Sequence, residues 1–511
     1  MVYKNNKTLI TMKRTKIVAT IGPASESRNM MEKLISAGMN VARLNFSHGT
    51  YSNHQILIRN LRSASKIAKT TVAIMQDLQG PRIRIGEVSK DGVKVVKKNI
   101  VILVTENFTI PNKTTDIYIP IQYPTLYQEI KAGHSVLIDD ANIELEVIKI
   151  KNKAVYCRVV TPGIIKTHKG MNFPQTDIKC PPITSKDWQD LEFGVKNGLD
   201  FVALSFVKDA SDVMRLRKRI FTLEAKYHNN KVVSKYKLEK PKAKGKIGGV
   251  HMRIIAKIER REAVDNIDSI LEVADAIMIA RGDLGIELPF EDLPLIQKTI
   301  IDKCRKAGKQ VIVATQMLDS MIRNPLPTRA EVSDVANAIL DGTDAIMLSG
   351  ETASGAYPLK AVQAMTKIAK EVETRLIDEQ EAKEGEFKNL NSITQVMSFM
   401  AQDLAEDVTG AKLIVCATTS GFTARNISRF RSKVPIIAVA PSPMTVNQMS
   451  LSWGVSAYYI PFSSSFDVLS KKIKVTLLKN KLVKLGDTII LVGGHPFGFK
   501  GQTNLIKVEV I

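Results

Sequence analysis

Hydrophobic residues recur along the chain in two alternating patterns, from Lys13 to about residue 375. Short, continuously apolar segments predict buried strands, and the longer segments between them, with apolar residues every three or four positions, predict amphipathic helices. The eight predicted strands are 16–22, 40–46, 72–78, 201–207, 253–259, 276–280, 311–316 and 345–350. Apolar strands that alternate with helices form a parallel sheet covered by helices, and eight such units predict a (β/α)8 TIM barrel.

Two regions break this pattern and predict further domains. Residues 87–182 hold short alternating segments rich in Lys, Val and Ile, which we interpret as an inserted, β-barrel-like lid. After an acidic linker, a second alternation of strands and helices predicts a C-terminal doubly wound α/β domain. The predicted limits are 1–12 for an N-terminal extension, 13–86 and 183–375 for the barrel, 87–182 for the lid and 376–511 for the C-terminal domain.

The 511-residue chain shows no feature of a membrane or secreted protein. No apolar run approaches the roughly 20 residues that span a bilayer, and the basic N-terminus lacks the apolar core of a secretory signal. The four cysteines lie far apart without metal-binding spacing, which indicates a reducing compartment. We therefore expect a cytoplasmic protein with no membrane partner.

A net charge of +22 raises the question of an anionic partner. Residues 226–246 carry eight lysines and one glutamate, and they fit either a solvated basic loop or a nucleic-acid-binding arm. The spacing fits no helical face, and only Tyr227 and Tyr236 are available for stacking on bases, which favours the loop. Nucleic-acid binding is thus the alternative function, and a positive field equally suits anionic substrates.

Polar residues follow the predicted strands at their C-terminal ends, where TIM barrels carry their active sites. Lys257 and Glu259 share one face of a strand because alternate side chains point the same way, and Asp283 follows the next strand. A lysine beside two carboxylates can hold a divalent cation and a phosphoryl group, although the same residues also fit a buried ion pair and a capped helix. Together, the polar residues at the eight strand ends would form a strongly basic pocket suited to binding phosphates.

At these residues the chain resembles the pyruvate kinase family over nearly its whole length. The matching segments are TIGPAS, NVARLNFSHG, DLQGPRIRIG, AKIERREAVDNID, IMIARGDLGIELP, VIVATQMLDSM, PTRAEVSDVANAILDGTDAIMLSGETASGAYP and the terminal TNLIKV. The resemblance implies a homotetramer that transfers a phosphoryl group from phosphoenolpyruvate to ADP, giving pyruvate and ATP in the last step of glycolysis. Another barrel enzyme acting on phosphoenolpyruvate or pyruvate fits less well, because the C-terminal domain and the motif set are complete.

The resemblance also implies roles for individual residues. Glu259 and Asp283 are the implied ligands of Mg²⁺ or Mn²⁺, and Lys257 lies against the transferring phosphoryl group. The remaining implied substrate and proton-transfer residues are Arg43, Ser205, Gly282, Thr315, Ser349 and Glu351. The implied nucleotide contacts are Pro23, Arg43, His48, Arg84 and Lys169. Asp140 matches an acid of the lid, although Ala141 and Asn142 beside it depart from the family pattern.

One departure concerns potassium. Many family members need K⁺ and have a glutamate where this chain has Arg82, whereas potassium-independent members usually have a lysine there. Our hypothesis is that the Arg82 guanidinium replaces the ion beside Asn45, Ser47 and Asp77, so that K⁺ is not required. The alternative is that Arg82 turns to solvent and K⁺ still binds.

A loop in the C-terminal domain predicts an effector site. Hydroxyl groups and a glycine precede a predicted helix there, at Thr418, Thr419, Ser420, Gly421 and Thr423. Such a loop can cradle a phosphate, and the family uses it for a sugar-phosphate effector; the alternative is an ordinary helix cap. A sugar phosphate and AMP both remain open as the effector, since the late loop offers His495 and Lys500 but no arginine.

Overall fold

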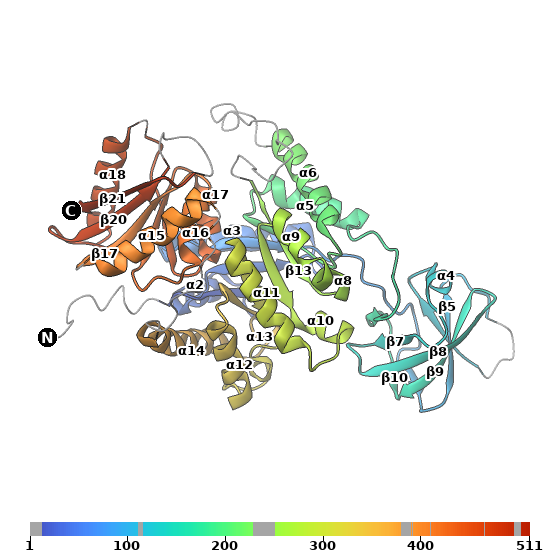
Figure 1. Ribbon diagram of the computed structural model, residues 1–511. Coiled ribbons are helices and arrows are strands. Elements are labelled where there is room, and N and C mark those ends of the chain that lie inside the picture. The colour runs from blue at the N-terminus through green and yellow to red at the C-terminus, as the bar shows by residue number, and fades with distance from the viewer. Residues whose placement is uncertain are drawn as a thin grey trace.

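The computed structural model describes residues 13–110, 116–227, 251–379, 390, 392–408, 410–463, 465–494 and 502–511. In Figure 1 these residues form three parts in a row, with a barrel in the middle, a C-terminal domain (orange and red) at one end and a β-rich lid (cyan) at the other. The predicted N-terminal extension, most of the lysine-rich segment 226–246, His495 and Lys500 lie outside the described residues.

The central part is a closed barrel of eight parallel strands, so the predicted TIM barrel is confirmed. The strands follow one another around the barrel in the order β1-β16-β15-β14-β13-β12-β3-β2. Their bounds are β1 Lys16–Thr20, β2 Val41–Asn45, β3 Ala73–Asp77, β12 Phe201–Leu204, β13 Arg253–Ile258, β14 Ala276–Ala280, β15 Gln310–Ala314 and β16 Ala345–Leu348. Most strands end before the predicted C-terminal limit, because the polar residues there belong to the connecting loops.

Amphipathic helices cover the outside of the barrel and bury their apolar faces against the strands. The long helices are α2 Arg28–Ala37, α3 Tyr51–Ile67, α5 Ser185–Lys196, α6 Ala210–Tyr227, α11 Leu293–Ala307, α12 Arg329–Leu340 and α14 Pro358–Glu379. The short ones are α8 Arg261–Asp265, α9 Ile267–Val273, α10 Arg281–Glu287, η1 Asp319–Ile322 and α13 Gly350–Ala353. None of the helices among the described residues is long and apolar enough to cross a membrane.

The lid is a β unit with its own apolar core. Its main sheet has the strand order β11-β7-β8-β9-β5-β6, and β10 pairs with β4 beside it. The bounds are β4 Val93–Val95, β5 Ile100–Thr105, β6 Ile117–Ile121, α4 Leu126–Glu129, β7 Ser135–Ile138, β8 Ile143–Lys151, β9 Ala154–Thr161, β10 Gly163–Ile165 and β11 Met171–Asn172. The chain enters the lid after β3 and returns before α5, both at the C-terminal end of the barrel strands.

The C-terminal domain is a helix-covered, mostly parallel sheet, as the second alternation predicted. Its strand order is β19-β18-β17-β20-β21, with only β21 antiparallel to its neighbour. The elements are α15 Ile393–Asp407, β17 Ala411–Ala417, α16 Phe422–Ser428, β18 Ile436–Ala440, α17 Pro443–Gln448, η3 Met449–Leu451, β19 Val455–Tyr459, α18 Phe466–Lys479, β20 Thr488–Gly493 and β21 Leu505–Val510.

The inward-facing side chains of the barrel connect its two ends. Apolar residues such as Phe201, Ile255 and Met278 fill the middle, and Leu451 of the C-terminal domain packs against this cluster from the N-terminal end of the strands. Polar inward-facing residues at that end bind the C-terminal domain: Lys16 Nζ donates to the Val455 carbonyl oxygen at 2.8 Å. The N-terminal end of the barrel is therefore closed by a domain, and only the C-terminal end is free to hold substrates.

Candidate active site

Lys257 of β13 lies at the centre of a buried charge cluster at the C-terminal end of the barrel. Its Nζ is 2.7 Å from Glu259 Oε1 and 3.3 Å from Asp77 Oδ1, and it donates a hydrogen bond to Ser205 Oγ at 2.8 Å. Burial alone lowers the pKa of a lysine, but Asp77 and Glu259 outweigh burial and raise the pKa of Lys257 above its ordinary value. Lys257 is therefore a fixed positive charge.

Asp77 at the end of β3 joins this lysine to Arg43 of β2. Arg43 Nε donates to Asp77 Oδ2 at 2.6 Å, and Arg43 Nη1 donates to Thr20 Oγ1 at 3.0 Å. Burial favours a raised pKa for Asp77, but Lys257 and Arg43 outweigh it and hold the pKa of this carboxyl below its ordinary value. Asp77 thus stays ionised and keeps two cations side by side at the strand ends.

Glu259 and Asp283 are the two carboxylates predicted to hold a metal ion. Glu259 is buried, accepts a hydrogen bond from the Phe206 amide at 2.7 Å, and has its pKa raised by burial and by the nearby Asp283. Asp283 lies in the first turn of α10 and is about one quarter exposed. Among the described residues no group of three or more His, Cys, Asp or Glu side chains forms a metal site. Two carboxylates fit Mg²⁺, which keeps water and substrate oxygens as its other ligands.

Thr315, after β15, has an unusual backbone conformation. Its φ is +69°, in the left-handed region that a β-branched residue rarely adopts. The hydroxyl accepts a hydrogen bond from the Gly282 amide at 2.7 Å and donates to the Ala314 carbonyl oxygen at 2.6 Å. The Gly282 amide, predicted to bind the substrate carboxylate, is therefore already paired here, and a carboxylate would have to displace the Thr315 hydroxyl.

Arg281 explains how this strained loop is held, and sequence reasoning missed it. Its Nη2 donates to the Thr315 carbonyl oxygen at 2.9 Å, and both of its terminal nitrogens bond to the Asp334 carboxylate at 2.7 Å. The side chain is largely buried between α10 and α12. In the sequence, the only signal for this role was that Arg281 directly precedes the Gly282–Asp283 turn. Its partner Asp334 lies 53 positions away and could not be recognised.

Ser349 and Glu351 lie on the next strand end. Glu351 is 2% exposed, and its carboxylate accepts hydrogen bonds from the Ser349 amide at 2.7 Å and the Leu318 amide at 3.2 Å. Burial raises the pKa of Glu351. Neither residue hydrogen-bonds to Thr315 among the contacts that the structure describes, and Glu351 fixes the loop beside Thr315 through the Leu318 amide.

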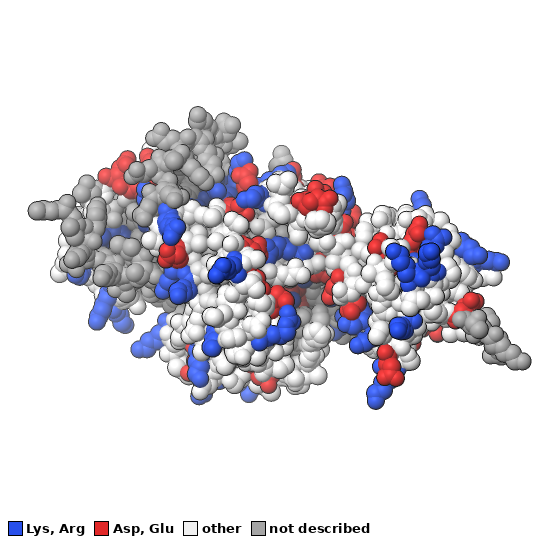
Figure 2. Space-filling model, turned by 90° about the horizontal axis from the view of Figure 1, so that it is seen from below, with Lys and Arg blue, Asp and Glu red and all other residues white. Residues whose placement is uncertain are grey.

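Arg82 lies between the lid and the barrel. Its Nη2 is 3.1 Å from Asp140 Oδ1 of the lid and 4.0 Å from Asp283 Oδ1. In the described part of the chain it forms no hydrogen bond or ion pair with the predicted monovalent-ion residues Asn45, Ser47 and Asp77. Asn45 Oδ1 instead accepts a hydrogen bond from the Ser47 amide at 3.1 Å. Basic and acidic side chains meet where the lid joins the barrel, as Figure 2 shows.

The predicted nucleotide contacts are distributed over the lid and the rim of the barrel. Lys169 of the lid pairs with Asp139 at 2.7 Å, and Arg84 Nη1 donates to the His168 carbonyl oxygen at 2.9 Å. Burial, and then Arg82, lowers the pKa of Arg84. Of the other three, Arg43 is paired with Asp77 as described above, and Pro23 and His48, which follow β1 and β2, are exposed.

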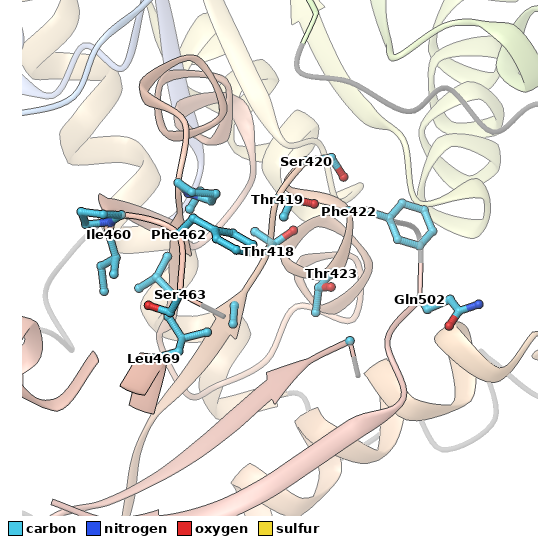
Figure 3. A pocket seen from close by; sticks show the side chains of 16 residues that line it. Thr418, Thr419, Ser420, Phe422, Thr423, Ile460, Phe462, Ser463, Leu469 and Gln502 are labelled. Carbon is cyan, nitrogen blue, oxygen red and sulfur yellow. The ribbon is translucent and has the colours of Figure 1, made fainter. Parts of the chain in front are cut away.

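The predicted effector loop lines a pocket in the C-terminal domain. The pocket holds about 640 Å³, including space open to solvent. In Figure 3 the hydroxyl-bearing residues of the loop face apolar side chains from the other wall, which sequence reasoning missed: Ile460, Phe462 and Leu469. Gly421 has φ +76°, and Thr423 Oγ1 hydrogen-bonds with Thr503 Oγ1 at 2.9 Å. The structure thus brings the predicted loop residues together around one cavity.

Two family models match the chain. The pyruvate kinase barrel domain matches residues 12–244 and 242–362, and the pyruvate kinase alpha/beta domain matches residues 395–509. The chain belongs to the pyruvate kinase family.

Curated relatives and a solved structure agree with this assignment. Pyruvate kinase of Geobacillus stearothermophilus is 43% identical over 506 residues, covering 98% of this chain and 80% of the relative. Pyruvate kinase of Clostridium acetobutylicum is 40% identical over 500 residues, covering 98% of this chain and all of the relative. The crystal structure of a pyruvate kinase from Cryptosporidium parvum superimposes with a TM-score of 0.86 at 34% identity, over 99% of this chain and 97% of that one.

Membership in the pyruvate kinase family gives the reaction. The chain is an enzyme that transfers phosphate from phosphoenolpyruvate to ADP and requires a divalent metal. The buried cluster around Lys257 lies at the strand ends where this fold carries its chemistry. The matches give no support to the alternative nucleic-acid role.

Replacing Lys257 by methionine tests the cluster. We expect kcat for pyruvate formation to fall by about 10²–10³-fold, because the fixed cation is removed from the position where negative charge develops. The measurement is a coupled assay of pyruvate release at saturating substrate. Lys303→Met, which removes a surface lysine paired with Asp268 on the outside of the barrel, is the matched control and should leave kcat unchanged. A Lys257→Met enzyme with near-normal kcat would contradict the assignment.

Proposed function

We propose that phosphoryl transfer takes place at the C-terminal end of the barrel, around Lys257. The observation that carries the proposal is the position of this lysine, buried between Asp77 and Glu259. A compact cation on a strand offsets the charge that spreads over the phosphoryl oxygens in the transition state. Arg43, fixed by Asp77, would hold the phosphate of the substrate, and Ser205 would keep the lysine ammonium in place.

Glu259 and Asp283 would hold the divalent metal, Mg²⁺ or Mn²⁺, in this proposal. Support comes from their chemistry: both offer carboxylate oxygens, Asp283 is partly exposed, and Glu259 lies 2.7 Å from the Lys257 ammonium. A divalent cation bound there supplies positive charge to the phosphoryl oxygens and to the substrate. Lys257, which remains beside the pair, orients Glu259 and opposes the rise in the pKa of its carboxyl.

The proton that completes pyruvate would be delivered near Thr315. Its hydroxyl is held at a defined position by the Gly282 amide and the Ala314 carbonyl oxygen, and Arg281 anchors its backbone. Ordered water at this hydroxyl can carry the proton to the enolate. Ser349 and Glu351 would act by fixing the neighbouring loop, consistent with the hydrogen bonds that Glu351 accepts from it.

The lid would close over the nucleotide. Lys169 and Arg84 are basic residues on two paired segments of the lid region, and His48 and Pro23 follow β2 and β1 at the C-terminal end of the barrel strands. The ion pair of Lys169 with Asp139 is partly exposed and therefore weak enough to exchange for nucleotide phosphates, and Arg84 is held by a carbonyl oxygen. Closure excludes water from the transfer step.

The metal assignment is tested by chelation and by substitution. We expect EDTA to abolish pyruvate formation and added Mg²⁺ or Mn²⁺ to restore it. Glu259→Gln and Asp283→Asn should each raise the Mg²⁺ concentration for half-activation by about tenfold or more, because each removes a charged ligand. Asp268→Asn, at an exposed carboxylate on the outside of the barrel, is the control and should leave this concentration unchanged. Unaltered metal dependence in both site variants would refute the assignment.

We further propose that Arg82 makes potassium unnecessary. A guanidinium already stands 4.0 Å from Asp283, so a fixed positive charge is present beside the proposed metal site. Arg82 is held by Asp140 of the lid rather than by Asn45, Ser47 or Asp77, so its charge would act from the lid side.

A potassium titration tests Arg82. In buffer free of sodium and potassium, the wild-type enzyme should show full activity and Arg82→Glu should become dependent on added KCl. Arg82→Gln, which removes the charge without reversing it, should show a smaller dependence. The hypothesis fails if the wild type needs potassium, or if the activity of Arg82→Glu does not change with KCl.

We also propose that the loop at Thr418–Thr423 binds the phosphate of a sugar-phosphate or AMP effector. The support is the cavity beside it, which combines hydroxyl groups with apolar walls. In a panel of sugar mono- and bisphosphates and AMP, at least one compound should change the KM for phosphoenolpyruvate. Thr418→Val combined with Thr423→Val should remove the response, whereas Thr476→Val on the outer helix α18 should retain it. An unresponsive wild type would overturn this proposal.

Finally, we propose a homotetramer in the cytoplasm. Large apolar side chains are exposed on the single chain, including Phe290 at 84%, Leu326 at 75% and Ile393 at 75%, which favours burial in an assembly. Light scattering in solution should give the mass of four chains, and the mass of one chain would contradict the proposal.

A further inference from the structure

Arg253 joins the catalytic strand β13 to the C-terminal domain. It is the first residue of that strand and is 9% exposed. Its Nε donates to Gln448 Oε1 at 2.8 Å, and its Nη2 donates to the carbonyl oxygen of Ser420. Among the described residues it pairs with no carboxylate, so these neutral acceptors hold a buried cation. Burial lowers the pKa of Arg253, although Asp275 opposes the change.

The two acceptors of Arg253 differ in how firmly they are held. Gln448 also donates hydrogen bonds to the carbonyl oxygens of Asp200 at 3.1 Å and His251 at 2.7 Å, so it is fixed to the barrel. Ser420 belongs to the loop that lines the pocket of the C-terminal domain (Figure 3). The Ser420 carbonyl oxygen also accepts a hydrogen bond from Arg425 Nη1 at 3.0 Å, which ties it to the C-terminal domain. A change in that loop would therefore move the Ser420 acceptor relative to the barrel, whereas Gln448 is tied to the barrel by its own hydrogen bonds.

Strand β13 can carry such a change to the active site. Arg253, Ile255 and Lys257 lie on the same, inward side of the strand because they are two residues apart. Ile255 is fully buried in the barrel interior, and hydrogen bonds to β12 and β14 hold both edges of the strand. A rigid, close-packed element transmits a small displacement along its length.

Two other inward-facing barrel residues contact the C-terminal domain outside this loop. Lys16 donates to the Val455 carbonyl oxygen, and Gln310 Nε2 donates to Ser452 Oγ at 2.7 Å. Both acceptors lie near the start of β19 and outside the loop in the sequence. Ser452 Oγ is 4.0 Å from Met449 Sδ, and Met449 lies against Gly421, so this contact reaches the loop through an intervening side chain. Arg253 differs from these two residues because it hydrogen-bonds directly to the pocket loop and lies on the same strand as Lys257.

We propose that Arg253 is a positioning residue that couples the loop Thr418–Thr423 to the active site, so that the state of this loop sets the positions of Lys257 and Glu259. The coupling would act on the binding of phosphoenolpyruvate, because Lys257 contacts its phosphoryl group in the function proposed above. The inference rests on that proposed function for the active site, and it adds a route of regulation to the proposed effector site.

A double-mutant cycle tests the coupling without any effector. Gly421→Ala disturbs the loop, because an added Cβ would lie 2.2 Å from Met449 Cε and the backbone φ is +76°. We expect this change to shift the KM for phosphoenolpyruvate by about fivefold, with a smaller effect on kcat. Arg253→Met should itself shift the KM, and in its presence Gly421→Ala should add less than about twofold. Independent, multiplicative effects of the two changes would overturn the proposal.

Arg217→Met is the matched control at the same end of β13. Arg217 pairs with Asp275 at 2.8 Å, and Asp275 accepts the Ile254 amide at 2.9 Å, so this pair supports the strand without contacting the pocket loop. The effects of Arg217→Met and Gly421→Ala on the KM should be independent, so that their fold-changes multiply in the double variant. Loss of the Gly421→Ala effect in this control as well would show general damage to the strand and would contradict a specific role for Arg253.

Hydrogen–deuterium exchange gives a second measurement, which needs no change at Arg253. We expect Gly421→Ala to alter amide exchange in the peptide 253–259 while leaving the peptide 310–314 of β15 unchanged. Unaltered exchange at 253–259 would contradict the coupling.

If the phosphate panel gives no response but the cycle shows coupling, the effector proposal fails and this inference stands. If an effector shifts the KM but the effects of Gly421→Ala and Arg253→Met simply multiply, the effector proposal stands and only the coupling through Arg253 fails.

Discussion

The buried ion cluster of Lys257, Asp77 and Glu259 is the interaction on which the active site depends. Removing three charged groups from water is costly, and the cluster is tolerated because each group meets an opposite charge or a hydrogen-bond donor. The parallel barrel supplies this geometry, since it brings the ends of β3, β12 and β13 together. The same cluster that fixes Lys257 also fixes Arg43 through Asp77, so the two cations for phosphate are positioned as a unit.

The inward-facing residues of the barrel strands serve two ends of the barrel. At the C-terminal ends they form the charge cluster, whereas at the N-terminal ends Lys16, Arg253 and Gln310 bind the C-terminal domain. Apolar residues such as Ile255 fill the space between. A strand of five or six residues thus spans from the domain interface to the reacting groups, and the proposed role of Arg253 follows from this short distance along one strand.

Sequence patterns predicted what depends on local periodicity. The eight apolar runs located the barrel strands, and the two-residue spacing put Lys257 and Glu259 on one face, where they pair at 2.7 Å. Contacts between distant positions were not predictable, as with the pairing of Arg281 to Asp334 and of Arg82 to Asp140. The left-handed backbone of Thr315 was also missed, because tertiary hydrogen bonds impose it on a residue that disfavours it.

The most direct test of this account is the position of the metal beside Lys257. Crystals grown with MnCl₂ and measured for anomalous scattering should show a Mn²⁺ peak about 2 Å from carboxylate oxygens of both Glu259 and Asp283. Lys257 Nζ should then still contact the other oxygen of Glu259. A peak at Asp77 or at Asp140 of the lid, with none between Glu259 and Asp283, would contradict the account.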